Sequence, residues 1–367
     1  MRIHPHDYVT DRAVPGTGLA ALCDLIEAER AAHPNTLLFD NGDFLQGNPL
    51  GDHAAAALAR NRPGLHPMIA AMNTVGYDAA TLGNHEFNFG LAFLERALEG
   101  AQFPVVASNL RLAPGLVFPA LPHVILERDL IDNHGQSRRL RVGVLGLVPP
   151  ASEIWDRQQI GGRVGITEMT AAARTHAAQL RHAGADLVVA LCHSGIARPG
   201  VNRPDPGGEY GACAVSAVAG IDAIIAGHSH QVFPAPAFAG RPEVDVVAGR
   251  LNGIAATMPG FGGSHLGVID LDLTLAAGGT WHLSSGRGSV IALAPWITGR
   301  GAEHAAGRTG GRTGGRTASA MLAVTRDAHE ATRAAMRQPV GQTTQALHSY
   351  FSLVRDSAVV RLAATAQ

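Results

Sequence analysis

Four short apolar runs in this sequence each end in residues that can bind a metal ion. The runs are 37–39, 79–82, 186–191 and 221–226. The polar ends that follow them are Asp40-Asn41-Gly42-Asp43, Gly83-Asn84-His85-Glu86, Cys192-His193 and Gly227-His228-Ser229-His230. Short apolar runs bounded by turn residues are typical of buried strands. Because ligands of α/β sheets bind beyond the carboxyl ends of the strands, we expect the four polar ends to meet at one site.

The side chains at these four ends carry carboxylate, amide and imidazole groups. Such a set suits Zn, Mn, Fe, Co or Ni ions. An Asp at a strand end can bridge two ions with its two oxygens, and two ions about 3.5–4 Å apart can hold a phosphoryl group and activate a water molecule. Asn84 offers a neutral oxygen, which limits the charge of the site. His228 and His230 lie two positions apart on a loop and can reach different ions.

His85 is predicted to act in catalysis rather than as a metal ligand. It directly follows Asn84 in the second polar end. A histidine at this place can protonate a leaving oxygen or stabilise the transition state.

Taken one at a time, these residues also have ordinary structural explanations. An Asp after a strand is commonly a turn former or a helix cap, and a single His beside an apolar run is commonly a structural residue. Four strand ends that share one ligand chemistry and one topological position favour the metal site over these separate explanations.

The composition is that of a globular protein and excludes several classes. The 367 residues are 46% hydrophobic and 16% charged, with a net charge of -1. This balance gives no electrostatic case for a nucleic-acid polymer or a membrane surface as partner, and the sequence has no run typical of a membrane span or a signal peptide. The three cysteines lack CxxC spacing, so neither a disulfide framework nor a thiolate zinc site is expected. The 18 histidines fit a metalloenzyme.

The periodicity of apolar residues alternates between strand and helix. Helices are predicted at 16–33 with Thr17 as N-cap, 52–60, 66–75, 91–98, 166–183, 213–219 and 318–336. Further strands are predicted at 104–107, 124–130, 140–148, 244–247 and 266–275. The repeated Gly, Arg and Thr residues of 299–317 predict a flexible loop. The fold class is therefore α/β (α+β), a two-layered β-sheet sandwich flanked by helices.

The strand-end motifs, in this order and spacing, resemble those of the calcineurin-like metallophosphoesterases. Within that family the match is to the 5'-nucleotidase branch and is closest to the bifunctional 2',3'-cyclic-nucleotide 2'-phosphodiesterase/3'-nucleotidases. The residues that carry this closer resemblance are 37–51, 83–90 and 347–353, and the resemblance covers nearly all of the chain.

The resemblance implies a role for each residue of the matching motifs. Asp43 would bridge two metal ions; Asn84, His193 and His228 would complete the second ion, and His230 would belong to the first. His85 would be the catalytic histidine facing the substrate phosphate, with Asn84 beside it. Plain 5'-nucleotidases pair this histidine with an Asp three positions later. Here that position is Asn88, which favours the cyclic-phosphodiesterase branch.

The activity implied is hydrolysis of nucleoside 2',3'-cyclic phosphates and 3'-nucleotides, with water activated by two divalent ions (Zn, Mn, Co, Fe or Ni). The expected partner is a small nucleotide substrate. Alternatives are a 5'-nucleotidase or other phosphomonoesterase of the same family, and a catalytically inactive metal-binding fragment. The resemblance also implies a periplasmic location.

Two departures from the family pattern concern the ends of the chain. The family opens with a strand that ends in Asp-x-His and supplies two ligands, and no such strand precedes His4. The family also has a C-terminal domain that binds the nucleoside base. We therefore expect residues 1–367 to form one metallophosphoesterase domain truncated at both ends. His4 and His6 are the alternative source of the missing ligands, although histidines near a terminus are commonly solvated.

Overall fold

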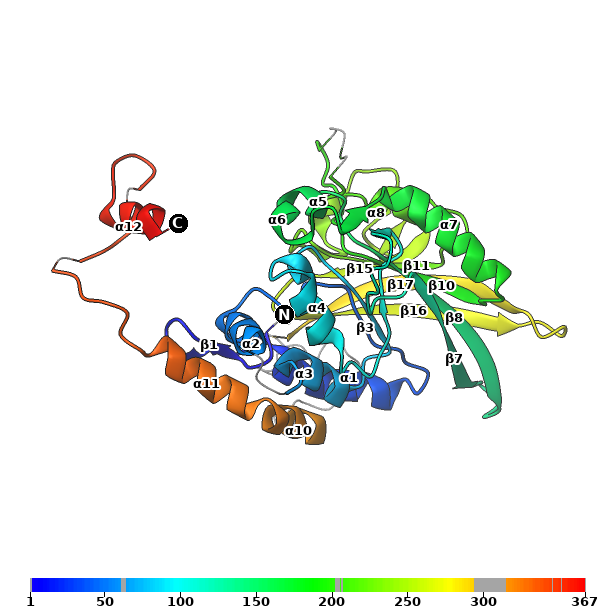
Figure 1. Ribbon diagram of the computed structural model, residues 1–367. Coiled ribbons are helices and arrows are strands. Elements are labelled where there is room, and N and C mark those ends of the chain that lie inside the picture. The colour runs from blue at the N-terminus through cyan, green and yellow to red at the C-terminus, as the bar shows by residue number, and fades with distance from the viewer. Residues whose placement is uncertain are drawn as a thin grey trace.

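Two β layers pack face to face at the centre of the molecule, and helices cover their outer sides (Figure 1). A computed structural model describes residues 2–60, 64–201, 205, 207–293, 315–344, 346–350 and 352–366. The predicted loop at 299–317 lies outside the described residues up to position 314. The sandwich with flanking helices confirms the fold class expected from the sequence.

The larger layer is a mixed sheet with a parallel centre. Its strands, in spatial order, are β13 (Val244–Asp245), β14 (Arg250–Leu251), β15 (Ile254–Pro259), β11 (Ala223–Ala226), β10 (Leu187–Cys192), β8 (Ser137–Leu147) and β7 (His123–Ile131), with β12 (Val232–Phe233) beside β15. Strands β8, β10, β11 and β15 run parallel, which places the ends of β10 and β11 side by side. All six residues of β10 are buried, as expected for a strand covered on both faces.

The second layer contains three short parallel strands and a long hairpin. The parallel strands are β3 (Phe39–Asp40), β4 (Ala79–Thr81) and β5 (Val105–Val106). The hairpin consists of β16 (His265–Leu275) and β17 (Trp281–Ala292) and packs on β15. Two small pairs complete the strands: β1 (His6–Asp7) with β2 (Arg12–Ala13), and β6 (Leu110–Leu112) with β9 (Val164–Ile166).

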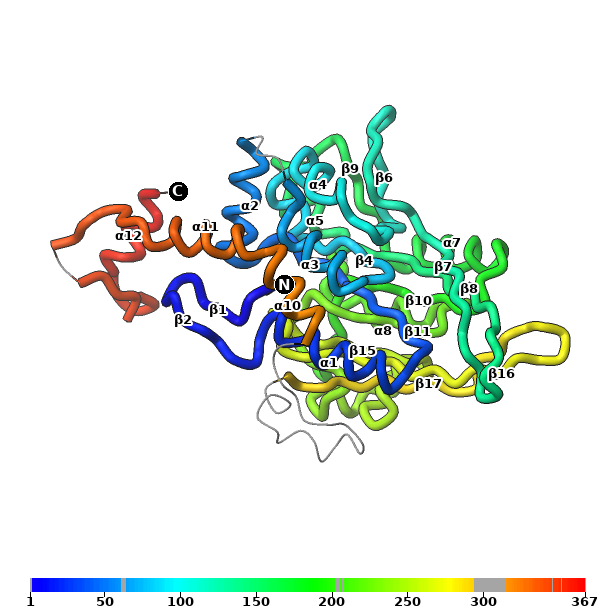
Figure 2. Tube along the Cα trace, turned by 90° about the horizontal axis from the view of Figure 1, so that it is seen from below, coloured from blue at the N-terminus to red at the C-terminus, as the bar shows by residue number. Residues whose placement is uncertain are grey.

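Helices lie outside both layers, as Figures 1 and 2 show. They are α1 (Leu19–Ala32), α2 (Pro49–Ala59), α3 (Pro67–Val75), α4 (Leu91–Leu98), α5 (Ser152–Trp155), α6 (Arg157–Ile160), α7 (Met169–His182), α8 (Ala212–Ser216), α10 (Arg316–Val324), α11 (Arg326–Met336) and α12 (Ala358–Ala366), with 3₁₀ turns η1 (His85–Phe87) and η2 (Pro236–Phe238). Their ends follow local chemistry. The Asn48 side chain caps α2, and Gly76 ends α3 in the left-handed conformation.

Two details of the predicted helices were wrong. Helix α1 begins after Gly18, and Thr17 donates its hydroxyl to Val14 instead of capping the helix. The single helix predicted at 318–336 is two helices that meet at Thr325. The Thr325 hydroxyl bonds the Met321 carbonyl and also lies 3.0 Å from His4 Nε2. A threonine that bonds back to the preceding turn commonly bends a helix.

The N-terminal histidines pack against α11. The His4 imidazole is buried and stacks on His329 with 4.0 Å between ring centroids, while His6 lies 3.0 Å from Asp11. These contacts commit both rings to the docking of α10 and α11 on the N-terminal segment. The alternative in which His4 and His6 replace missing metal ligands therefore has no support from this arrangement.

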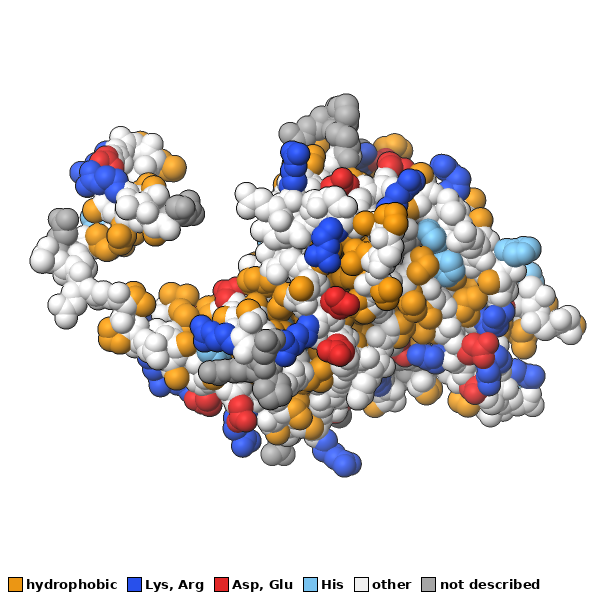
Figure 3. Space-filling view, viewed as in Figure 1, with side chains coloured by type: hydrophobic (Ala, Val, Ile, Leu, Met, Phe, Trp, Pro, Cys, Tyr) orange, Lys and Arg blue, Asp and Glu red, His pale blue; other side chains and the backbone are white. Residues whose placement is uncertain are grey.

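The segment after α11 leads away from the sandwich and carries α12 at its end (Figure 1). Helix α12 has no buried residue. Figure 3 shows hydrophobic side chains on this segment, while basic and acidic side chains are interspersed over the visible face of the body. The fold that positions the strand ends is thus formed by the residues up to α11.

Asn109 joins the end of β8 to the segment that precedes α7, and its loss should weaken the fold. Its buried amide donates to the Val148 and Thr167 carbonyls and accepts from the Val148 amide. Asn109→Ala leaves these groups unpaired inside the protein. We expect urea denaturation to give a free energy of unfolding lower by roughly 2–4 kcal/mol. Asn133→Ala, at an exposed turn, is the control; equal stability of both variants would contradict this role.

Candidate metal centre

The four predicted strand ends meet where the two β layers face each other. Strand β3 is parallel to β4, and β10 is parallel to β11, so each pair delivers two loops to the same edge. Contacts between the pairs close the arrangement. Asn41 donates its side-chain amide to the Cys192 carbonyl at 2.9 Å, and the Asn41 carbonyl lies 2.6 Å from His193 Nδ1.

The orientation of the His193 imidazole fits its predicted role as a metal ligand. A carbonyl oxygen can only accept, so Nδ1 carries the proton that it donates to Asn41, and Nε2 keeps its lone pair. This buried nitrogen lies 3.0 Å from Asp43 Oδ2, which makes an ion pair when the ring is protonated and two facing acceptors when it is neutral. Burial favours a lower pKa for His193, but the Asp43 carboxylate raises it overall. A nitrogen lone pair facing a carboxylate oxygen is the arrangement of two ligands around one cation.

Asn84 and His228 form the second pair of predicted ligands. His228 Nδ1 lies 3.0 Å from Asn84 Oδ1, which leaves Nε2 available for an ion. Burial and the neighbouring His193 lower the pKa of His228 to about 4, so the ring is neutral and able to ligate at pH 7. Trp155 stacks on the outer face of this ring with 5.7 Å between centroids.

His230, the fifth predicted ligand, lies at the rim. It is exposed and stacks on Phe261 with 4.7 Å between ring centroids. The same cavity is lined by Asp43, His85, His193, His228 and His230. The structure therefore brings His230 to the site without placing it in the inner cluster.

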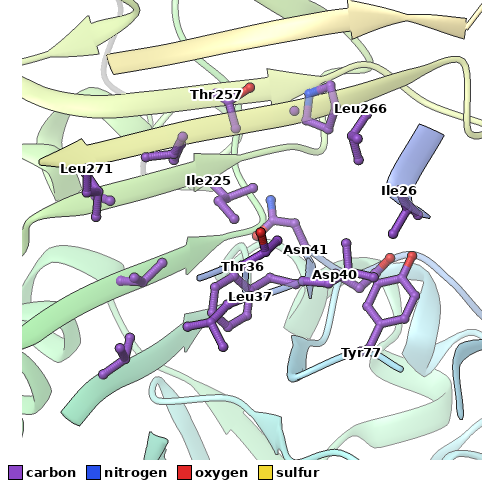
Figure 4. A pocket seen from close by; sticks show the side chains of 18 of the residues that line it. Ile26, Thr36, Leu37, Asp40, Asn41, Tyr77, Ile225, Thr257, Leu266 and Leu271 are labelled. Atoms are coloured by element: carbon purple, nitrogen blue, oxygen red, sulfur yellow. The ribbon is translucent and has the colours of Figure 1, made fainter. Parts of the chain in front are cut away.

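The cavity has a volume of about 1160 Å³ and continues between β3 and β16. Figure 4 shows Leu37 and Asn41 on one side of it and Leu266 and Leu271 on the other. Asp40 also lines this space, and burial raises the pKa of its carboxyl to about 7. The predicted ligands are thus reached through a large cavity between the two layers.

Glu86, to which the sequence analysis gave no role, holds the two ligand loops together. Its fully buried carboxylate accepts four backbone N–H groups at 2.7–3.0 Å. The donors are Asp43, Phe44, Leu45 and Gly83. Only the Glu at the end of the Gly83-Asn84-His85-Glu86 motif hinted at this role, and sequence spacing could not show which amides it would meet.

The ligand loops have strained backbones. Asp43, His228 and His230 all have positive φ angles, of 60°, 63° and 57°. Non-glycine residues in this region cost of order 1–3 kcal/mol each, and such strain clusters at functional sites. The backbone of these loops is thus shaped by where the side chains must point.

His85 lies beside the cluster and is held from two directions. Its backbone N–H donates to Asp43 Oδ1 at 2.9 Å. Its ring Nδ1 lies 2.6 Å from Asn88 Oδ1, and the Asn88 amide in turn donates to Asp156 Oδ1 at 2.7 Å. The ring therefore has a fixed partner on Nδ1, while the residue itself lines the cavity.

The residues fit a divalent ion, although the cluster is not a complete cage. Within the ranges that the structure describes, no group of three or more His, Cys, Asp or Glu side chains is arranged to hold a metal ion. One of the four inner ligands is an amide, and the other three are divided between the Asp43–His193 and Asn84–His228 pairs. The approach of His193 Nε2 to the Asp43 carboxylate, 3.0 Å apart inside the protein, is the observation that favours a cation between them.

The chain is similar to known proteins over almost its whole length. A family model described as calcineurin-like phosphoesterase matches residues 4–232. The 2',3'-cyclic-nucleotide 2'-phosphodiesterase/3'-nucleotidase of Salmonella typhimurium is 36% identical over 98% of this chain and 53% of its own length. The trifunctional nucleotide phosphoesterase protein YfkN of Bacillus subtilis is 36% identical over 99% of this chain and 24% of its own length.

A solved structure agrees with these matches. The crystal structure of calcineurin-like phosphoesterase YfkN from Bacillus subtilis has a TM-score of 0.80 and 35% identity, covering 92% of this chain and 96% of that chain. The chain spans about half the length of the Salmonella relative and about a quarter of the full YfkN protein.

Glu86→Gln should weaken both the fold and metal binding. A glutamine side chain would turn an NH₂ group toward two of the four backbone donors, and the loop that carries Asp43 would lose its anchor. We expect the free energy of unfolding to fall by roughly 2–4 kcal/mol, and zinc to raise the melting temperature less than in the unmodified protein. The measurement is thermal unfolding with and without zinc.

The control for this change is Glu95→Gln on the exposed side of α4. If the Glu86 variant melted like the Glu95 variant in both conditions, Glu86 would not be the anchor of these loops.

Proposed function

This chain belongs to the calcineurin-like phosphoesterases, and from that premise we propose that it hydrolyses nucleoside 2',3'-cyclic phosphates and 3'-nucleotides. The family resemblance drawn from the strand-end motifs is thereby confirmed. The choice of substrate is supported by relatives named 2',3'-cyclic-nucleotide 2'-phosphodiesterase/3'-nucleotidase, which are 34–36% identical over 98% of this chain. The observation that carries the proposal is the meeting of four strand ends around the Asp43–His193 pair.

The proposed cofactor is a pair of divalent ions drawn from Zn, Mn, Co, Fe or Ni. Calcineurin-like phosphoesterases use divalent metal ions. We assign Asp43, Asn84, His193 and His228 to one ion, and Asp43 with His230 to the other. When bound, such ions neutralise phosphate charge and make water nucleophilic.

His85 is proposed as the residue that protonates the leaving oxygen. In the cyclic substrate, a water oxygen forms a bond to phosphorus and releases one proton to solvent. The bond between phosphorus and O2' breaks, and the doubly protonated His85 ring passes its Nε2 proton to O2' and becomes the neutral Nδ1–H form. The product is the 3'-nucleotide. A second hydrolysis breaks the bond between phosphorus and O3' and yields the nucleoside and inorganic phosphate. His85 suits this role because its Nδ1 is already engaged by Asn88 and its Nε2 remains for the substrate.

Two alternative functions can be tested by experiment. Snake venom 5'-nucleotidases are 27–28% identical over 63–64% of this chain, which keeps a 5'-nucleotidase activity as the second candidate. Asn88 at the position where plain 5'-nucleotidases have Asp favours the cyclic substrate. The remaining alternative is a metal-binding chain without turnover.

We also propose an exported, periplasmic location, in keeping with the family resemblance, and a small nucleotide as the partner. The described helices include none that is both long enough and apolar enough to span a membrane.

Metal content tests the proposed ligand assignment. The purified 367-residue protein should retain two ions per chain by elemental analysis, and His193→Ala should lose at least one of them. Retention of a single ion by the unmodified chain would show that these five residues are insufficient for the second ion. Equal metal content in the His193 variant and in His182→Ala, an exposed histidine of α7, would refute the assignment of His193.

His85→Ala tests the catalytic role. We expect kcat on a 2',3'-cyclic nucleotide to fall by about 10²–10⁴-fold while bound metal is unchanged, because His85 moves a proton but holds no ion. Assays on a 3'-nucleotide and a 5'-nucleotide with the same samples separate the substrate alternatives. Unchanged turnover would remove His85 from the mechanism. A faster reaction with the 5'-nucleotide would favour the 5'-nucleotidase.

A further inference from the structure

A short segment between β8 and β9 contacts the candidate metal centre in addition to the four strand ends. It contains α5 and α6 and is anchored where Ile166 of β9 donates its N–H to Glu153. Its two consecutive residues Trp155 and Asp156 touch different parts of the centre. Trp155 stacks on His228, and Asp156 bonds Asn88, the partner of His85. The segment thus contacts a predicted ligand directly and reaches the predicted proton donor through Asn88.

Asp156 is the buried end of a hydrogen-bonded chain. Asp156 is 4% exposed, and its Oδ1 accepts a hydrogen bond from Asn88 Nδ2 at 2.7 Å. Asn88 Oδ1 lies 2.6 Å from His85 Nδ1. The chain therefore runs from a carboxylate through an amide to the imidazole, and it links residues 71 positions apart in the sequence (85 and 156).

The Asp156 carboxylate determines which groups in this hydrogen-bonded chain donate and which accept. An amide can present either its oxygen or its NH₂ group to a histidine, so Asn88 alone does not select the tautomer of the ring. A carboxylate only accepts, and it therefore draws the NH₂ group of Asn88 toward itself. The amide oxygen must then face His85, where it accepts only from a protonated Nδ1. With Nδ1–H held by Asn88, only Nε2 gains or loses a proton: it bears a lone pair in the neutral ring and the transferable proton in the imidazolium.

We propose that Asp156 is a positioning residue that acts through Asn88 to fix the orientation and the Nδ1–H tautomer of His85. Its consequence for turnover rests on the proposed function, because only there does Nε2 exchange a proton with substrate. The tautomer itself does not depend on activity. This explains how an Asn can take the place of an Asp beside His85. The negative charge that orients the ring is carried by Asp156, one side chain farther along the hydrogen-bonded chain.

The first test reads the tautomer directly. ¹⁵N-histidine NMR of the metal-free protein, with the His85 signals assigned by their absence in His85→Ala, distinguishes a protonated from an unprotonated ring nitrogen. We expect Nδ1–H in the unmodified protein and a mixture of tautomers in Asp156→Ala. An unchanged Nδ1–H signal in Asp156→Ala would overturn the proposal.

The second test exchanges the two polar groups. Asn88→Asp alone places two carboxylates against each other, whereas Asn88→Asp with Asp156→Asn restores a chain in which position 156 donates to position 88 and position 88 accepts from His85. We expect each of Asp156→Ala and Asn88→Asp to lower kcat by about 10–100-fold with little change in KM. Both Asn88→Asp and the double variant should keep the Nδ1–H signal, because a carboxylate at position 88 also accepts from Nδ1, and the double variant should regain most of kcat. If kcat of the double variant were no higher than that of Asn88→Asp, the proposed hydrogen-bonded chain would be refuted.

Glu153→Ala is the matched control, since it loosens the same segment at its anchor without touching Asn88. It should lower the melting temperature and leave the His85 tautomer unchanged. A tautomer change in Glu153→Ala equal to that in Asp156→Ala would mean that the segment acts by general packing, and the proposal would fail. If the unmodified protein showed no turnover, the proposed function would fail, while the NMR signals would still decide the role of Asp156.

Discussion

The buried carboxylate of Glu86 is the constraint on which the centre depends. Four backbone N–H groups from two separate loops point at its two oxygens. Burial is the largest influence on its pKa and raises it, and the charge of Asp43 adds to this effect. Backbone amides oppose the shift by stabilising the ionised form. The loops of β3 and β4 are therefore held in register by an interaction that contains no metal and no catalytic group.

Because the two loops lie this close together, only glycine fits at positions 42 and 83. Gly42 has a φ of +92°, and a Cβ there would lie 2.8 Å from His193 Nδ1. A Cβ on Gly83 would lie 2.6 Å from His193 Cε1. A Cβ on Gly42 would lie even closer to the Gly83 nitrogen, at 2.4 Å, and a Cβ on Gly83 to Asp43 Oδ1, at 2.2 Å, so a side chain at either glycine would displace the facing loop or the Asp43 carboxylate as well as the imidazole. The glycines of the two motifs are thus explained by the close approach of the two loops to each other and to His193, and the positive φ of Asp43 by the direction its carboxylate must take.

The sequence predicted what depends on neighbouring residues. Helix α4 has the predicted bounds, α3 ends at Val75 as predicted, and the four strand ends follow from apolar runs that stop at polar turns. Features that depend on distant partners could not be predicted in this way. The break at Thr325 involves His4, which is 321 residues away, and the strand β15 is defined by pairing with β11 and β12 rather than by its own pattern.

The same reasoning explains why His85 was predicted from the sequence and Asp156 was not. His85 stands inside a motif of consecutive residues, whereas Asn88 and Asp156 are separated in the sequence by α4 and by strands β5 to β8. Electrostatics gives a reason for this remote placement. Asp43 already lies beside His85, and a second carboxylate directly on the ring would add negative charge next to the site that we propose binds a phosphate anion. An amide transmits the orientation set by a carboxylate while carrying no net charge itself, so the ring can be aligned without increasing the repulsion that the substrate meets.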